Sequence, residues 1–249
     1  MQTLAVTPEI HADAEALSRA AAGYVLAAAQ SAIATRGVFH LALAGGSTPR
    51  RLYQLLAATP ADRVDWPHWQ IWFGDERCVP PDHADSNYRM AREALLDHVA
   101  IPAAQIHPMV HHPDDPAADA RAYAGQLTRD LITAAGVPVL DLVLLGMGDD
   151  GHTASLFPGT DILAVDDRPV AAVAAPGKGW RISLTYPVLE RARERLFLVA
   201  GAAKAPVLAQ VLADPQAAAP YPVARLAAGG GRWLLDRAAA QALDGPQEP

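Results

Sequence analysis

Short apolar runs recur along the chain, and several of them end in glycines and polar residues. The most informative run is Leu142 to Leu145, four consecutive apolar residues inside the stretch DLVLLGMGDDGHTASLFP, which spans Asp141 to Pro158. A continuous apolar run of this length, bounded by Gly146, is typical of a strand buried on both faces of a parallel sheet. We therefore predict a central strand that ends at this glycine.

The same reasoning predicts a series of strands and helices in alternation. Strands are expected at Val38 to Ala44, Gln70 to Phe73, Val170 to Ala174, Arg181 to Thr185, Leu196 to Ala200 and Trp233 to Leu235, with a minor strand at Ile106 to Met109. Helices are expected at Asp13 to Arg36, from the Gly45–Pro49 turn to about Ala58, at Asn87 to Val99 after a Ser86 cap, from about Ala117 to Ala135, and after Gly201, where the helix carries Lys204, Val207, Leu208 and Leu212. This alternation predicts an α/β fold with three layers, α/β/α, around a mainly parallel, doubly wound sheet. With no internal repeat and no long linker, the 249 residues fit a single domain, 1–249.

Composition narrows the classes of partner. The net charge is -7 and no block of Lys and Arg occurs, so we expect no nucleic-acid partner, although local basic residues can still bind a small anion. No cationic residue precedes Arg19, the first residues lack an apolar signal core, and the stretch from Ala20 to Thr35 is too weakly apolar to span a bilayer. We expect a cytoplasmic protein without a membrane partner. The single cysteine, Cys78, excludes an internal disulfide and is expected to be structural, with a reactive thiol as the alternative.

The loop after the central strand is the first candidate for chemistry. Its glycines permit tight turns, so Asp149, Asp150 and His152 can be held at the carboxyl end of the strand, where ligands bind in open α/β sheets. His152 is the best catalytic candidate because an imidazole can accept a proton near neutral pH and return it. Asp150 can orient the ring. A purely structural histidine is the alternative, and the loop alone does not decide between the two.

The turn Gly45-Gly46-Ser47-Thr48 is a candidate phosphate site. It presents backbone N–H groups and two hydroxyls at a predicted helix start, where the helix dipole favours an anion. Ser47 or Thr48 merely capping the helix is an equally good interpretation. The turn is not a complete P-loop, because no Gly-Lys-Ser/Thr sequence follows it. It is not a nucleophile elbow either, because Pro49 stands where the elbow needs its last glycine.

Charged residues follow other predicted strands. Arg77 and Arg181 can offer planar donors to a phosphate and Lys204 a compact charge, although each alone is more often a solvated surface residue. Asp75 and Glu76 can supply acid/base or hydroxyl-binding groups, or form an ion pair with Arg77, and Asp75 is the better candidate. No metal site is expected, since the chain has no HExxH motif and His111-His112 lies in a Pro/Asp loop without a third ligand.

Five segments together resemble the 6-phosphogluconolactonase family of the oxidative pentose phosphate pathway. They are LALAGGSTP, WFGDERCVP followed by SNYRMARE, LLGMGDDGHTASLFPGT, RISLTYPVL and VAGAAKAPVL, which stand in the family's order over most of the chain. The resemblance implies one α/β domain related to glucosamine-6-phosphate deaminase, no required cofactor and a phosphosugar lactone as substrate. It also implies that Gly45 to Thr48, Arg77, Arg181 and Lys204 surround the substrate phosphate, and that Asp75, Asp150 and His152 belong to the reacting end.

Two alternatives fit the same pocket. A sugar-phosphate deaminase/isomerase has a similar loop with a glutamate five residues after the histidine, and here that position is Phe157, which favours the lactonase. A non-catalytic sugar-phosphate sensor would keep the pocket, but the first predicted helix begins by about Asp13 and leaves no room for an N-terminal DNA-binding domain. The expected reaction is hydrolysis of 6-phospho-D-glucono-1,5-lactone, with His152 as the general base and Asp75 positioning the substrate.

Overall fold

A computed structural model describes residues 7–214 and 218–243 of the chain. Its centre is a six-stranded sheet in the order β1 (Glu9–His11), β11 (Arg232–Asp236), β10 (Glu194–Val199), β7 (Leu142–Leu145), β2 (Phe39–Leu43) and β3 (Trp69–Phe73). Every neighbouring pair of these strands is parallel. The prediction of an α/β fold around a mainly parallel sheet is therefore confirmed.

The strand β7, in the middle of the sheet, is fully apolar. All four residues of β7 are buried, as the continuous run Leu142 to Leu145 predicts for a strand covered on both faces. Trp69 and Trp72 of β3 and Phe39 of β2 are among the largest side chains that are completely buried. Burial of so much apolar and aromatic surface makes the sheet a rigid support for the loops at its ends.

The chain winds outward in two directions from the middle of the sheet. From β2 it passes through α2 (Ser47–Ala57) to β3, its neighbour on one side, whereas from β7 it passes to β10 and then β11 on the other side. Strands β2 and β7 lie next to each other, with Leu41 opposite Leu142. The sheet therefore has a topological switch point between them, which is the usual position of a ligand site in such sheets.

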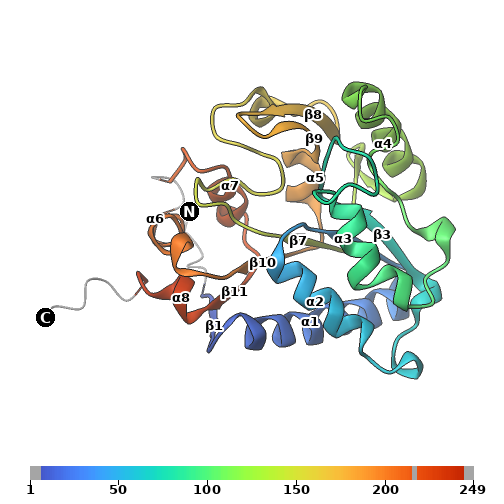
Figure 1. The fold of residues 1–249 in the computed structure, drawn as a ribbon, viewed down its shortest axis with the longest axis horizontal. Helices are drawn as coiled ribbons and strands as arrows, with labels where there is room; N and C mark the ends of the chain where they lie inside the picture. The colour runs from blue at the N-terminus through green and yellow to red at the C-terminus, as the bar shows by residue number, and fades with distance from the viewer. Residues whose placement is uncertain (1–6, 215–217, 244–249) are drawn as a thin grey trace, which may run out of the picture.

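Helices cover both faces of the sheet. Figure 1 shows α1 (Ala14–Arg36) and α2 together on one side and α5 (Tyr186–Arg191) and α7 (Pro222–Ala228) on the other. The first helix has the ends that its sequence predicts, because the side chain of Asp13 accepts the Ala16 N–H and Gly37 ends the helix with φ 77°. The remaining helices are α3 (Asn87–Ala94), α4 (Pro116–Asp130), α6 (Ala205–Ala213) and α8 (Arg237–Ala240).

A second sheet of three antiparallel strands adjoins the first. It is formed by β4 (Asp75–Arg77), β9 (Gly179–Leu184) and β8 (Val170–Ala175), and α4 packs against it. Asp75 to Arg77 are expected only as charged residues after the predicted strand Gln70 to Phe73, but they form a strand of their own, because pairing with β9 gives the segment extended geometry. The hairpin between β8 and β9 turns through Gly177 and Gly179, which both have positive φ.

Several predicted boundaries are wrong. Helix α3 ends at Ala94 instead of Val99, since Leu95 leaves helical geometry and a 3-10 turn, Leu96–His98, follows. Helix α4 ends at Asp130 instead of Ala135, because a short hairpin of β5 (Thr133–Ala134) and β6 (Val137–Pro138) follows it. The minor strand at Ile106 to Met109 is a single bridge between Ile106 and Ile71. Lys204 lies in a 3-10 turn, Ala202–Lys204, before α6.

The short elements β1, α5, α7 and α8 are absent from the sequence prediction.

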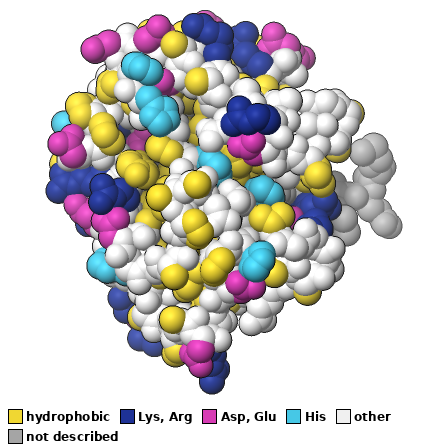
Figure 2. Space-filling model, turned by 90° about the vertical axis from the view of Figure 1, so that its right-hand side faces the viewer, with side chains coloured by type: hydrophobic (Ala, Val, Ile, Leu, Met, Phe, Trp, Pro, Cys, Tyr) yellow, Lys and Arg dark blue, Asp and Glu magenta, His cyan; other side chains and the backbone are white. Residues whose placement is uncertain are grey.

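The face of the molecule in Figure 2 carries basic and acidic side chains interspersed with histidines and apolar groups. Within residues 7–214 and 218–243, no helix combines the length and the apolar character needed to cross a bilayer.

Candidate active site

A cavity of about 240 Å³ opens at the switch point of the sheet. It lies where β2, β3 and β7 end, and the segment after β3 and the loop after β7 form its walls. Its lining includes Gly45, Gly46, Asp75, Arg77, Asn87, Gly146, Met147, Gly148, His152, Thr153, Ala154 and Lys204. The fold thus brings together residues from five parts of the chain that are far apart in sequence.

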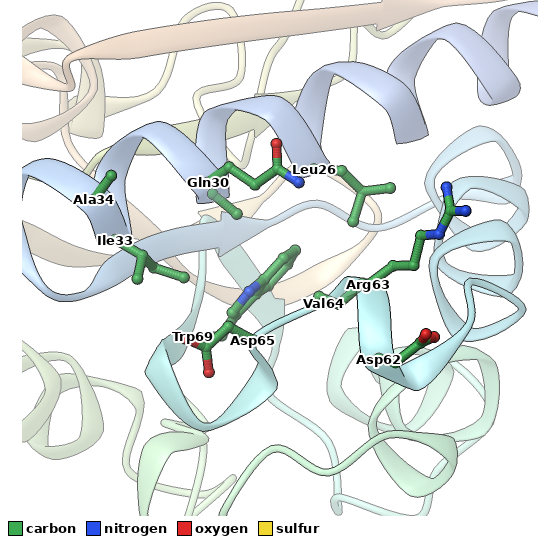
Figure 3. Close-up of a pocket in the computed structure, with 10 residues that line it drawn as sticks. Leu26, Gln30, Ile33, Ala34, Asp62, Arg63, Val64, Asp65 and Trp69 are labelled. Carbon is green, nitrogen blue, oxygen red and sulfur yellow. The ribbon is translucent and has the colours of Figure 1, made fainter.

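A larger hollow of about 520 Å³ lies elsewhere, between α1 and the segment that precedes β3. Figure 3 shows Leu26, Gln30 and Ile33 of α1 facing Val64 and Trp69 across it. Trp69 begins β3, so this hollow is at the amino end of that strand, opposite to the end where ligands bind in such sheets. None of the predicted site residues lines it. The smaller cavity is therefore the candidate active site.

His152 is held by the carboxylate of Asp150. The ring nitrogen Nδ1 lies 2.5 Å from Asp150 Oδ1, and the same oxygen accepts the backbone N–H of His152 at 3.1 Å. Because a carboxylate only accepts hydrogen bonds, Nδ1 carries a hydrogen and Nε2 of the neutral ring keeps its lone pair. The pair thus presents a base whose tautomer is set by its neighbour.

The surroundings of the pair favour a charged Asp150. Burial opposes ionisation, but the hydrogen bonds from His152 outweigh it and hold the pKa of the Asp150 carboxyl below its usual range. The ring of Phe157 packs against the imidazole with 4.5 Å between centroids. An apolar ring therefore lies beside His152 at the position where the deaminase pattern has a carboxylate.

Two glycines allow this loop to form. A Cβ on Gly148 would lie 2.1 Å from His152 Nδ1, so only glycine leaves room for the imidazole. Gly151 has φ 74°, and its backbone passes so close to Tyr221 that a Cβ would be 2.6 Å from that side chain. The carbonyl of Gly151 accepts the backbone N–H of Val223 at the start of α7. The loop is thus tied to an element that the sequence does not predict.

Asp75 is fixed by two side chains that the sequence analysis does not identify. Ser155 Oγ donates to Asp75 Oδ2 at 2.6 Å, and Asn87 Nδ2 donates to the backbone oxygen of Asp75 at 2.9 Å. Asn87 is only 2% exposed and lines the cavity, whereas Ser155 is completely buried. No local signal marks either residue, because each acts through a contact with a distant segment.

Glu76 has a structural position instead of facing the cavity. Its buried carboxylate accepts the backbone N–H groups of Arg77, Asn87 and Tyr88 and the hydroxyl of Ser86. Burial raises the pKa of this carboxyl, and the backbone hydrogen bonds act in the opposite direction. Neither Asp75 nor Glu76 forms an ion pair with Arg77. The alternative to a site role, in which one of these acids only pairs with Arg77, is therefore wrong.

The turn after β2 leaves a helix start open. Gly46 is the N-cap of α2 with φ 107°, and no side chain caps this helix. The structure therefore does not show Ser47 or Thr48 in the capping role, and their hydroxyls and backbone N–H groups are available to an anion at the positive end of the helix dipole. Gly45 and Gly46 line the cavity, whereas Ser47 and Thr48, the next two residues, are not among its lining residues.

The predicted basic residues occupy two places. Arg77 and Arg181 lie opposite each other on β4 and β9, and their guanidinium groups donate to the backbone oxygens of Asp85 and Trp180. Burial and the nearby charge of Arg77 lower the pKa of Arg181, while the charges of Asp75 and Glu76 act in the opposite direction. Lys204 lines the cavity and pairs with Asp149, whereas Arg181 is not among the residues that line the cavity.

Other candidate groups have structural surroundings. Burial raises the pKa of Cys78 to about 11, so the thiol stays protonated near neutral pH and is not a nucleophile. His111 and His112 are both exposed, and their backbone N–H groups donate to Asp119. Across the described ranges, no three His, Cys, Asp or Glu side chains are grouped so that they could hold a metal ion.

Comparisons with known proteins identify the family and its fold. A sequence model of the family described as glucosamine-6-phosphate isomerases/6-phosphogluconolactonase matches residues 12–235. A 6-phosphogluconolactonase from Nostoc is 44% identical over 239 residues, which cover 95% of this chain and 98% of the relative. The crystal structure of 6-phosphogluconolactonase from Leishmania guyanensis superposes with a TM-score of 0.85 at 33% identity, over 96% of this chain and 99% of that one. A monomeric glucosamine-6-phosphate deaminase has the same fold, with a TM-score of 0.78 at 19% identity over 95% of this chain and 99% of its own.

Proposed function

The chain belongs to the family of glucosamine-6-phosphate isomerases and 6-phosphogluconolactonases, and we propose that it hydrolyses 6-phospho-D-glucono-1,5-lactone to 6-phospho-D-gluconate in the oxidative pentose phosphate pathway. The observation that carries the choice within the family is the packing of Phe157 on His152. An imidazole oriented by Asp150 and covered by an apolar ring is suited to activating water. It lacks the additional carboxylate that the deaminase pattern has at this position.

In the proposed mechanism, Nε2 of His152 takes a proton from a water molecule as the water oxygen attacks C1 of the lactone. The bond between C1 and the ring oxygen then breaks, and the imidazolium returns its proton to that oxygen. Asp150 stabilises the imidazolium and keeps the ring in place. The product is an open-chain acid, and the reaction requires no metal, no cofactor and no covalent intermediate.

The phosphate of the substrate would bind at the other side of the cavity. Gly45 to Thr48 would offer backbone N–H groups and hydroxyls. Positive charge would come from Arg77 and Lys204, which line the cavity, and from Arg181, which lies opposite Arg77 on the neighbouring strand. Binding at this remote group would hold C1 near His152, so its binding energy lowers the barrier of the chemical step. Asp75 would position the sugar. We further propose that residues 1–249 act as one domain in the cytoplasm on this small-molecule substrate.

The test compares two substrates on one preparation of the purified protein. Fresh 6-phosphogluconolactone should be hydrolysed well above its spontaneous rate, measured in buffer alone, and glucosamine 6-phosphate should release no ammonia. Ammonia release without lactone hydrolysis would replace the proposal with the deaminase reaction. Turnover of neither substrate, with tight binding of both, would indicate a sensor.

A further inference from the structure

The side chain of Asn87 has a fixed orientation in the cavity. Its Nδ2 group donates to the backbone oxygen of Asp75 at 2.9 Å and lies 3.5 Å from Asp75 Oδ1. A backbone oxygen can only accept, so a flipped amide would place two oxygens against each other. The backbone N–H of Asn87 is also bound, by Glu76 Oε1 at 2.8 Å. The amide oxygen Oδ1 must therefore point away from Asp75.

This oxygen has no hydrogen-bond partner among residues 7–214 and 218–243. No N–H or O–H group of the described residues donates to Asn87 Oδ1, and the oxygen is not sealed inside the protein. Since Asn87 is only 2% exposed and lines the cavity, the cavity is the side from which a donor can approach. Nearly all polar groups in such surroundings have a hydrogen-bond partner, and this acceptor has room for one.

Gly45 leaves the space that the amide fills. A Cβ on Gly45 would lie 2.1 Å from Asn87 Oδ1 and 2.9 Å from Nδ2, closer than any side chain could remain. Gly45 does not have the positive φ that makes glycine necessary at many turns. At this position glycine is therefore explained by the close approach of Asn87, in addition to its place in the phosphate turn.

Asp75 and Asn87 together present acceptors only. Ser155 Oγ donates to Asp75 Oδ2 at 2.6 Å, and Asn87 Nδ2 lies 3.5 Å from Oδ1, so both oxygens of the carboxylate have a donor beside them. The ring of the 1,5-lactone carries hydroxyl donors at C2, C3 and C4. Two neighbouring acceptors of fixed direction are complementary to hydroxyls on adjacent carbons.

We propose that Asn87 Oδ1, beside the carboxylate of Asp75, accepts a hydrogen bond from one ring hydroxyl of the sugar and thereby selects the substrate. This inference rests on the function proposed above and adds a residue to it. A site built to bind a hydroxyl discriminates strongly against an analogue that lacks it, because the protein acceptor is then left without a partner.

The experiment combines variants of the protein with altered substrates. The wild-type protein and Asn87→Ala are assayed with 6-phosphogluconolactone and its 2-deoxy, 3-deoxy and 4-deoxy analogues, each corrected for spontaneous hydrolysis. For the wild type, one analogue should lose at least about tenfold in kcat/KM. For Asn87→Ala the natural lactone should lose a similar factor, and removal of that same hydroxyl should have little further effect.

Two variants separate this role from a structural one. Gly45→Ala should give the pattern of Asn87→Ala, because its Cβ would displace the amide, and it serves as an independent perturbation if Asn87→Ala folds poorly. Ser155→Ala removes the other support of Asp75 and leaves Asn87 in place, so it should still discriminate against the deoxy analogue. Thermal melts monitored by circular dichroism check that each variant is folded.

The results distinguish failure of the inference from failure of the function. If the wild type hydrolyses the natural lactone but turns over all three deoxy analogues equally well, Asn87 does not bind a hydroxyl. The same conclusion follows if Asn87→Ala loses the same factor in kcat/KM as the wild type for each deoxy analogue, so that the effects of the substitution and of the missing hydroxyl are independent. If the wild type does not accelerate hydrolysis of the natural lactone, the proposed function itself is wrong, and the inference falls with it.

Discussion

At the scale of single residues, the site separates the proton acceptor from the group that orients it. His152 has Nδ1 bound to Asp150, no described residue is bound to Nε2, and Phe157 packs against the ring. Removal of the imidazole should therefore affect the chemical step and leave phosphate binding largely intact. Asp150 should matter less, since an amide at this position can still accept the bond from Nδ1 but cannot stabilise the imidazolium by charge.

We predict that His152→Ala lowers kcat for the lactone by about 10²- to 10⁴-fold, whereas Asp150→Asn causes a smaller but measurable loss. The KM of both variants should stay within about threefold of the wild-type value, because uniform binding of the substrate is retained. Steady-state kinetics corrected for the spontaneous reaction would measure both. Turnover by His152→Ala at a rate close to that of the wild type would overturn the role of the histidine.

The sequence reveals these residues unequally. His152 is predictable because glycines and acids surround it directly after a buried strand, so all the signals are local. Ser155 and Asn87 are not, because each acts on Asp75 from a distant point of the chain. The roles of His152 and Asp150 are predictions that the kinetics of His152→Ala and Asp150→Asn test, and the roles of Arg181 and Lys204 are likewise predictions.

At the scale of elements, the junction of β4 with α3 depends on one buried carboxylate. Glu76 is 2% exposed, and each of its two oxygens accepts two donors from residues 77 and 86–88. A carboxylate at the start of a helix is also favoured by the helix dipole. The alternation along β4 then places Asp75 and Arg77 on the cavity side.

Glu76→Gln should lower the free energy of unfolding by about 2 kcal/mol or more. The NH2 group of the glutamine replaces one carboxylate oxygen, and it cannot accept the hydrogen bonds that this oxygen receives. Urea denaturation followed by circular dichroism measures this change. Glu93→Gln, on the neighbouring helix α3, is the matched control, since the exposed ion pair of Glu93 with Arg89 at 2.6 Å should contribute less than about 1 kcal/mol to stability. Equal effects of the two variants on the free energy of unfolding would show that Glu76 does not stabilise the junction of β4 with α3.

The sequence predicts well the elements that have a continuous apolar run or a long stretch of helix-forming residues. The long helix α1 and the apolar strands β2, β7 and β10 follow their patterns closely. Strand β4 does not, because Asp75 to Arg77 are polar and extended geometry comes only from pairing with β9. The short helices α5, α7 and α8 have too few residues to give a helical pattern, and tertiary contacts determine them.

At the scale of the whole molecule, a buried histidine links the sheet to α4. His107 stacks on Trp72 with 3.9 Å between ring centroids, Gln126 donates to its Nδ1 at 2.7 Å, and its Nε2 lies 2.8 Å from Gln70 Oε1. This arrangement satisfies a neutral imidazole. Burial lowers the pKa of His107 to about 4.

The molecule should therefore lose stability in mild acid. Between the ordinary histidine pKa of about 6.5 and the folded value of about 4, the unfolded chain binds the proton that the folded protein excludes, so stability falls as the pH falls. Allowing for partial solvent screening, we expect this residue to account for about 1–2 kcal/mol of that fall. Urea denaturation of the wild type and His107→Phe at several pH values between 7 and 4.5 would measure it.

The variant keeps the stacking ring and loses the titrating group. His107→Phe should be less stable than the wild type at pH 7 because Gln70 and Gln126 lose their partner, but its stability should decline less on acidification. The effects of carboxylates are common to both proteins and cancel in the difference. Parallel declines would mean that His107 does not contribute to acid sensitivity.

Because of the way the sheet is wound, enzyme activity can be used to measure how completely this protein is folded. Strands β2 and β7 meet at Leu41 and Leu142, about a hundred positions apart, and the cavity is completed by Lys204 from still further along the chain. No continuous fragment of modest length contains the site. Lactone turnover is therefore a stricter measure of native structure than helix content, since it requires that both halves of the sheet have joined in register.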